Sequence, residues 1–185
     1  PFKLRRAHLN DPRAILVLDR LEQELSTKFS VSGSGRGIAY AQYKNEMTRV
    51  GAAVELTISD AAQIQIQSIV LVADAGRIVD ADGLRAQLEG GALQAISWAL
   101  FEIVTWDKDG VTSRDWNSYP VLRFPDVPKI ETILLNQPTG KSLGAGEASP
   151  GPVLAAIANA VADLTGLRAR SLPMTPDSLK TLALS

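Results

Sequence analysis

The stretch GAAVELTISDAAQIQIQSIVLVAD, residues 51–74, decides the fold class of this chain. Both halves are rich in β-branched and alternating residues, which predicts two strands over 51–58 and 64–74. The short polar segment 59–63 predicts a tight turn, so the two strands should form a hairpin. Glutamines alternate with isoleucines early in the second strand, which indicates a solvated face. The continuously apolar run 69–73 indicates burial on both faces.

Helical and further strand signals surround this hairpin. Apolar residues recur at helical spacing on both sides of it, and Gly, Pro and small polar residues punctuate the chain between the periodic segments. The predicted helices span 10–25, 80–103 and 152–165, with a short final helix after Thr175. The other predicted strands span 37–43 and 130–135, with a small hairpin at Asp109-Gly110 and loops over 30–37 and 119–128.

These elements predict an α+β fold, in which two or three long helices pack on a mostly antiparallel or mixed sheet. The 185 residues favour a single domain over 1–185, with an N-terminal helical lead-in over 1–30 and a core over 31–185. The chain begins without an initiator methionine, so we expect a segment of something longer.

Composition excludes several classes of function. The net charge of −1 and the lack of a basic stripe argue against a nucleic-acid partner. The chain has no cysteine and one histidine, His8, which excludes thiolate metal sites, multi-histidine metal sites and a cysteine nucleophile, so we predict no metal ligands here. No apolar run reaches the ~18 residues that a membrane span requires. Absence of cysteine suits either the cytoplasm or the periplasm.

Glu147 is the first candidate site, in the stretch SLGAGEASPGPVLAAIANAV at 142–161. One interpretation makes it a capping carboxylate at a helix start, worth about 0.3–1 kcal/mol. The other makes it an acid or base on a loop where Gly144 and Gly146 let the backbone approach a ligand. Pro150 and Pro152 delay the helix, which makes Glu147 a poor cap.

Three other segments have both a functional and a structural interpretation. Gln87 and Gly90-Gly91 could face a flat polar ligand, but a glycine contact between two packed elements is the interpretation that we favour. The segment 32–37 could cradle a phosphate, yet it lacks the ending of a P-loop and we interpret it as a linker. The segment 72–80 could form an acidic pocket edge or simply a strand-to-helix turn.

Taken together, four segments resemble the C-terminal part of the molybdopterin-binding large subunit of the xanthine oxidase/aldehyde oxidase family, in its bacterial isoquinoline 1-oxidoreductase β-subunit form. They are VADAGRIVDADGLRAQLEGGALQAISWALFE, YPVLRFPDVPKIET, SLGAGEASPGPVLAAIANAV and LPMTPDSL. The resemblance implies oxidation of an N-heterocycle or an aldehyde with water as the oxygen source, and Glu147 as the general base. It also implies a group of cofactor-binding residues: Gln87, Gly144, Ala145, Gly146, Ala148 and Ser149.

The same resemblance implies a molybdopterin cofactor, usually in its cytosine dinucleotide form, and an iron–sulfur small subunit as partner. The family's large subunit is several times longer, and its other half carries further cofactor loops that have no counterpart here. We therefore expect a fragment or subunit that does not hold the cofactor tightly alone and is inactive in isolation.

Two other functions remain open, a catalytically inert folding or assembly domain of that lineage and a small-anion-binding module at residues 144–151. If the double-glycine face of the helix over 80–103 lacks its partner, it would expose an apolar patch that favours a homo-oligomer.

Overall fold

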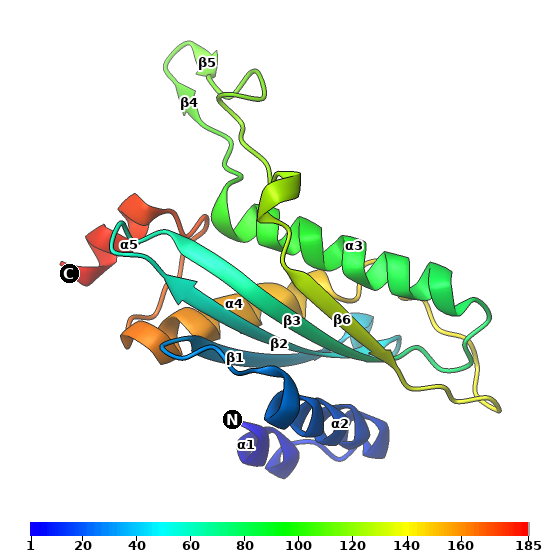
Figure 1. Ribbon diagram of the computed structural model, residues 1–185. Helices are drawn as coiled ribbons and strands as arrows, with labels where there is room; N and C mark the ends of the chain where they lie inside the picture. Colours follow the sequence, from blue (N-terminus) through cyan, green and yellow to red (C-terminus); the bar gives the residue numbers. More distant parts are fainter. Residues whose placement is uncertain (185) are drawn as a thin grey trace.

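The computed structural model describes residues 1–184 and has three layers, with helices on both faces of one sheet (Figure 1). The four strands are β1 (Gly35–Gln42), β2 (Arg49–Ile58), β3 (Ile64–Asp74) and β6 (Lys129–Leu134), in the order β1-β2-β3-β6. β1, β2 and β3 run antiparallel, and β6 runs parallel to β3. The predicted α+β class with a mixed sheet is confirmed.

The predicted hairpin is also confirmed. Ile58 pairs with Ile64 across a turn in which Ala62 adopts a positive φ of 66°, and a bulge follows Glu55. The parallel pair is a finding that strand patterns alone did not predict. α3 (Ala81–Leu100) connects β3 to β6, which gives one crossover unit within an otherwise antiparallel sheet.

The three long helices divide the core between the two faces of the sheet. α2 (Pro12–Lys28) covers one face, where Val17 and Leu21 pack with Ala53 of β2. α3 and α4 (Pro150–Thr165) cover the other face, where they pack with Val54 of β2. Neighbouring residues of β2 therefore face opposite layers. Two short helices, α1 (Phe2–Ala7) and α5 (Pro176–Ala183), lie near the ends of the chain.

The prediction of a loop over 30–37 is wrong in its second half, because β1 already begins at Gly35. A Cβ on Gly35 would lie 2.2 Å from the Ala160 carbonyl oxygen of α4, and a Cβ on Gly37 would lie 2.0 Å from the Ala156 carbonyl oxygen. Two strand residues span about 6.7 Å and four helical residues about 6.0 Å, so the two glycines meet successive turns of α4. The glycines therefore serve close packing in a strand.

Helix boundaries differ from the predictions by a few residues. α4 begins at Pro150, since proline has no N–H group and suits the first helical turn. α3 ends at Leu100, three residues before the predicted end. The residues at the helix ends are typical caps: Asp11 caps α2, Thr175 caps α5, and Gly166 ends α4 with a φ of 75°. α1 lies within the predicted helical lead-in over 1–30, but it was not predicted as a separate helix.

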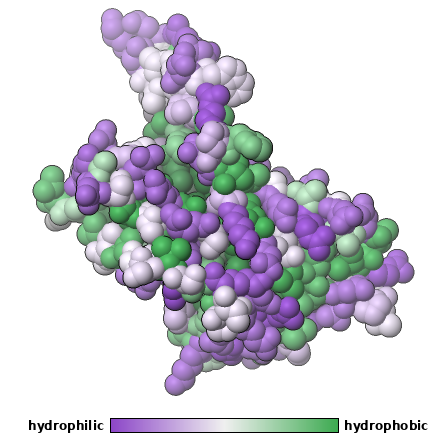
Figure 2. Space-filling model, in the orientation of Figure 1, coloured by the Kyte–Doolittle hydropathy of each residue, from purple (hydrophilic) through white to green (hydrophobic). Residues whose placement is uncertain are grey.

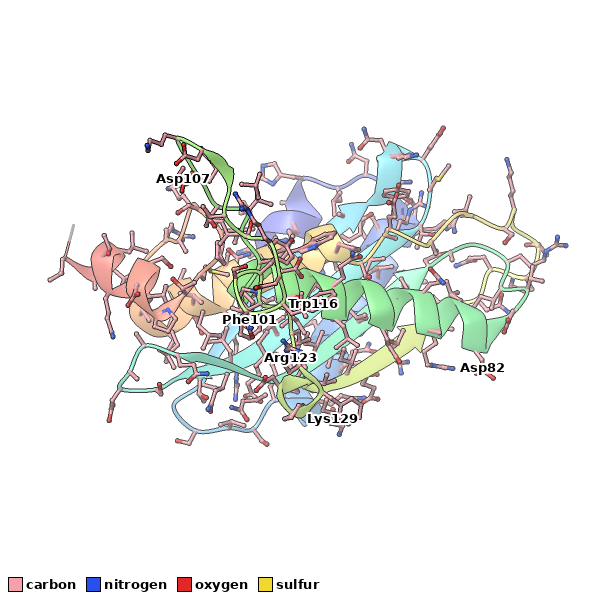
Figure 3. The ribbon with its side chains drawn as sticks, turned by 90° about the horizontal axis from the view of Figure 1, so that it is seen from above. Asp82, Phe101, Asp107, Trp116, Arg123 and Lys129 are labelled. Carbon is pink, nitrogen blue, oxygen red and sulfur yellow. The ribbon has the colours of Figure 1, made fainter. Side chains whose placement is uncertain are left out.

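The segment between α3 and β6 forms an arm, defined here as residues 101–128, that extends away from the three layers (Figure 1). Figure 3 shows the chain leaving α3 at Phe101, passing Asp107, and returning through Trp116 and Arg123 to Lys129. The predicted small hairpin is present as β4 (Trp106–Asp107) and β5 (Gly110–Val111), followed by a 3-10 turn, η2 (Phe124–Asp126). The exposed large hydrophobic side chains of the arm are Ile103, Val104, Trp106, Val111, Trp116, Phe124 and Val127.

Candidate functional site

The loop between β6 and α4 carries Glu147 and is attached on both sides of that residue. At its middle, Ser142 forms an isolated bridge with Gly76, and the Leu143 N–H donates 2.9 Å to the Ala75 carbonyl. At its end, the buried Ser149 hydroxyl donates 2.7 Å to the Leu88 carbonyl of α3. The loop therefore lies against the β3–α3 turn and the N-terminal half of α3, where the yellow segment of Figure 1 runs.

Glu147 is exposed and lies two residues before Ser149, the N-cap residue of α4. Its carboxylate accepts a hydrogen bond from the Tyr43 hydroxyl. Within residues 1–184, no backbone N–H of the helix donates to it. The geometry therefore favours a loop carboxylate over a helix cap. This hydrogen bond, with a smaller contribution from burial, raises the pKa of the Tyr43 phenol.

The two glycines of the loop bring it close to other elements. A Cβ on Gly144 would lie 3.3 Å from the sulfur of Met47, and one on Gly146 would lie 3.5 Å from the Gln87 side-chain oxygen. Both glycines are exposed, as is Gln87. The structure thus brings Gln87 beside the loop, although the two are about 60 residues apart in the sequence.

The backbone N–H groups of residues 144–147 form no hydrogen bond with any group in the described part of the chain. Two of these four residues are exposed glycines, so a ligand can approach the backbone without meeting a side chain. Consecutive free N–H groups are suitable donors for phosphate, carboxylate or carbonyl oxygens. These four N–H groups are therefore the donors that the loop could offer to a planar polar ligand.

Ala148 and Ser149, two of the predicted cofactor-binding residues, are 4% and 0% exposed. Because both residues are buried, neither side chain can contact a cofactor directly, and only the backbone of the neighbouring loop residues could do so. Their side chains serve packing: a Cβ on Gly91 of α3 would lie 2.4 Å from the Ser149 hydroxyl. The packing interpretation of the double glycine is therefore confirmed for Gly91. A Cβ on Gly90 would instead meet nothing within 4 Å, and this residue faces solvent.

The interpretation of 72–80 as a strand-to-helix turn is confirmed. Asp74 is 0% exposed and its carboxylate binds the Arg13 guanidinium at 2.7 and 2.5 Å. Asp74 also accepts the Gly76 N–H at 2.9 Å, and Asp80 caps α3. Burial raises the pKa of Asp74, but the hydrogen bonds from Arg13 and Gly76 outweigh it and the net pKa is lowered. The turn on which the Glu147 loop rests is therefore fixed by α2.

Sequence analysis did not identify Tyr43 or Met47. Both lie in the turn between β1 and β2, which begins with η1 (Tyr43–Asn45). Lys44 and Asn45 adopt left-handed φ angles of 50° and 61°. No sequence pattern relates Tyr43 to a carboxylate 104 residues away. The polar run after Tyr43 was the available signal for a turn at this point.

Within residues 1–184, no group of three or more histidine, cysteine, aspartate or glutamate side chains has the arrangement of a metal site. None of the helices described combines the length and apolarity needed to cross a membrane.

Comparison with known proteins identifies the family to which this fold belongs. Residues 20–128 match the family model of the molybdopterin cofactor-binding domain, a segment that includes Tyr43 and Gln87 and ends before the Glu147 loop. The chain belongs to this molybdopterin-binding family, within the xanthine oxidase group.

Two curated relatives match nearly the whole chain. A nicotinate dehydrogenase subunit of Pseudomonas putida is 34% identical over 97% of this chain and 17% of its own length. The beta subunit of isoquinoline 1-oxidoreductase from Brevundimonas diminuta is 31% identical over 95% of this chain and 23% of its own length. The chain thus spans about a fifth of the length of these relatives.

Solved structures of two oxidoreductases share the fold. Quinoline 2-oxidoreductase from Pseudomonas putida aligns with a TM-score of 0.70 at 24% identity, over 75% of this chain and 19% of that chain. Aldehyde oxidoreductase from Desulfovibrio gigas aligns with a TM-score of 0.65 at 25% identity, over 75% of this chain and 16% of that chain.

Proposed function

We propose that this chain supplies the base-bearing part of a molybdenum hydroxylase active site, with Glu147 as the general base. One observation carries the proposal: the Glu147 carboxylate is exposed on a glycine loop, caps no helix, and lies near the open backbone beside Gln87. The names of the two curated relatives support an N-heterocycle as substrate, and the aldehyde oxidoreductase supports an aldehyde as the alternative.

The residues present fit one side of a molybdopterin cofactor. The N–H groups of residues 144–147 and the Gln87 amide would hold it, and Gly144 and Gly146 would let it approach the backbone. When bound, the cofactor supplies the two-electron redox chemistry of the hydroxylation, for which water is the oxygen source. Resemblance to the bacterial enzymes supports its cytosine dinucleotide form.

Glu147 would accept the proton that this reaction releases. A general base must come within hydrogen-bond reach of the proton that it removes. The Tyr43 hydroxyl donates to Glu147 Oε2, which leaves Oε1 without a hydrogen bond among the residues described and available to accept the proton. Ser149 and Gly91 would act indirectly, because they fix the end of the loop against α3. Ala145 would keep the loop apolar beside the carboxylate, and the buried Ala148 would act indirectly, by packing the end of the loop on the core.

The proposed partners are the remainder of the large molybdopterin-binding subunit and an iron–sulfur small subunit. The first follows from length, since the chain covers 17% and 23% of its two curated relatives. One loop and one amide are few donors for a cofactor of dinucleotide size, so we propose that the chain alone does not retain it. Metal analysis of the chain alone and of the chain with its partners tests this point. Stoichiometric molybdenum in the chain alone would contradict it.

The decisive test of the function is Glu147→Gln in the complete enzyme. Loss of a positioned general base lowers kcat by roughly 100- to 10,000-fold. Molybdenum content should stay unchanged, because the substitution keeps the size of the side chain. Glu89→Gln, on the neighbouring helix, is the matched control and should retain turnover. Unchanged turnover in Glu147→Gln would contradict the proposal.

The alternative of an assembly domain has one observation in its favour, the exposed hydrophobic side chains of the arm. Adding the missing large-subunit portion separates the two functions: hydroxylation should appear for an active half-site and stay absent for an inert domain. The anion-binding alternative has less support at the helix, since Pro150 and Pro152 leave Gly151 as the one N–H donor in its first three positions.

A further inference from the structure

We propose that Tyr43 is the positioning residue of Glu147: its hydroxyl holds one carboxylate oxygen and leaves the other oriented to accept a proton. This inference rests on the proposed role of Glu147 as the general base. It adds a residue from the β1–β2 turn to a site otherwise made by α3 and the loop before α4.

The contact that carries the inference is the hydrogen bond from the Tyr43 hydroxyl to Glu147 Oε2. Within residues 1–184, the Glu147 carboxylate has no other hydrogen bond or ion pair. An exposed glutamate with no partner samples several rotamers, and fixing it costs side-chain entropy. The Tyr43 hydroxyl is therefore the one group in the described chain that restricts this carboxylate.

Tyr43 is itself held in place. Its half-buried ring packs against the hydrophobic core between the sheet and α3 and α4. Its N–H donates 2.9 Å to the Thr48 carbonyl, and its carbonyl accepts the Met47 N–H at 2.9 Å. The Lys44 ammonium lies 5.3 Å from the centre of the ring. A rigid donor of this kind can orient a flexible carboxylate.

The turn that presents Tyr43 has an unusual backbone. Lys44 and Asn45 are both left-handed, at φ angles of 50° and 61°. This region favours glycine, and asparagine tolerates it better than lysine does. Such residues cluster at functional sites, where surrounding structure holds them. The same turn also places Met47 against Gly144, so it contacts the loop on both sides of Ala145 and Gly146.

The charges around the pair keep Tyr43 a hydrogen-bond donor. The Glu147 carboxylate raises the pKa of the phenol, and Lys44, the other charged group facing it, opposes that shift. The net effect is a raised pKa, so Tyr43 keeps its proton at neutral pH. Gln87, the polar side chain on the other side of the loop, is uncharged.

The experiment compares Tyr43→Phe with Tyr119→Phe in the 185-residue chain. Tyr119 is a matched control because its hydroxyl also donates to a glutamate, Glu102, at 2.8 Å on the arm. We expect the three-bond Hα–Hβ couplings of Glu147, measured by NMR, to show one dominant rotamer in the native chain. Tyr43→Phe should average them while retaining the ring and the fold, and Tyr119→Phe should leave them unchanged. Unchanged couplings in Tyr43→Phe would overturn the proposal.

A second readout follows the phenol instead. NMR of ¹³C-labelled tyrosine follows the titration of each phenol. Glu147→Gln should move the pKa of Tyr43 towards its ordinary value of 10.0. Glu102→Gln, the control, should move the pKa of Tyr119 in the same way and leave that of Tyr43 unchanged. An unmoved Tyr43 titration in Glu147→Gln would contradict the pairing.

In the complete enzyme, Tyr43→Phe should lower kcat by about tenfold, the equivalent of one charge-assisted hydrogen bond, with KM unchanged. Native kcat in this variant, together with an inactive Glu147→Gln, would overturn the role of Tyr43 and leave the proposed function intact. Native kcat in Glu147→Gln would overturn both, even if NMR shows the pair.

Discussion

The surface where α4 meets β1 and α3 differs sharply from the arm. In the first region, a Cβ on Gly35 or Gly37 would meet backbone atoms of α4, and a Cβ on Gly91 would meet the side chains of Ser149 and Pro150, so none fits between the elements. In the arm, Trp116 is 70% exposed and Phe124 is 92% exposed. Figure 2 shows hydrophilic residues at the tip of the arm and hydrophobic residues gathered at its base.

This difference separates the part of the structure whose apolar side chains are buried within the chain from the part whose apolar side chains stay exposed. The packed region buries its apolar side chains and anchors the Glu147 loop, so its geometry is defined within this chain. The arm exposes aromatic area that a monomer usually buries. Because the curated relatives are several times longer, the remainder of the large subunit is the partner that we propose for the arm.

The largest expected effect comes from breaking the packed region with Gly37→Val. A Cβ at this position would lie 2.0 Å from the Ala156 carbonyl oxygen and 2.3 Å from the Ala160 nitrogen, both backbone atoms that cannot rotate away. Overpacking of this kind should destabilise the fold by about 3 kcal/mol or more. Urea denaturation measures the loss. Gly151→Ala, where nothing lies within 4 Å, is the control and should keep native stability.

The two adjacent glycines of α3 sharpen the comparison within a single helix. Gly91→Ala would place a Cβ 2.4 Å from the Ser149 hydroxyl and 3.2 Å from Pro150, so it should destabilise the fold by about 1–3 kcal/mol. Gly90→Ala meets nothing within 4 Å and should stabilise α3 by up to about 1 kcal/mol. In thermal unfolding, Gly91→Ala should lower the melting temperature and Gly90→Ala should raise it. Equal changes in the two variants would contradict the assigned packing.

These examples show what sequence patterns could predict. Periodicity and caps predicted the hairpin, the long helices and the α+β class, because each depends on residues close in sequence. The strand role of Gly35 depends on a backbone about 125 residues away, and the β3–β6 pair depends on how α3 packs, so neither has a local pattern. The double glycine indicated a close contact, but only Gly91 makes one, and a Cβ on Gly90 would meet nothing within 4 Å.

The candidate site was predictable only in part. The residue pattern singled out Glu147 with its glycines and Gln87 as candidates, the family resemblance supplied their roles, and the structure brings them together. Tyr43 was missed because its hydroxyl meets Glu147 through a turn with two left-handed residues, a conformation that neither Lys44 nor Asn45 demands locally.

A smaller effect is expected at Asp74, which fixes the turn beneath the Glu147 loop. Asp74→Asn should lower the free energy of unfolding by about 2 kcal/mol at pH 7, because it weakens a charge-assisted pair with Arg13. The folded-state pKa of Asp74 lies below its ordinary value of 3.8, so this stabilisation is present above pH 3.8 and fades as the pH falls further.

Chemical denaturation of both proteins across this range tests the sign of that dependence. The difference between native chain and Asp74→Asn should shrink at acid pH. Asp60→Asn, at an exposed turn, is the control and should follow the native curve at every pH. A difference that grows on acidification would contradict the assigned pair.

The smallest effect on stability is expected in the arm. Replacing Trp106, Trp116 and Phe124 together by serine should change the free energy of unfolding by no more than about 0.5 kcal/mol per site, because all three side chains are largely exposed. The same variant should lose self-association in light scattering and binding to the remainder of the large subunit. Serine at Leu4, Val79 and Leu184, which are exposed outside the arm, is the matched control. If both variants lost association equally, general surface hydrophobicity would explain it. A loss confined to the arm variant would instead identify the arm as the surface that joins this chain to its partner.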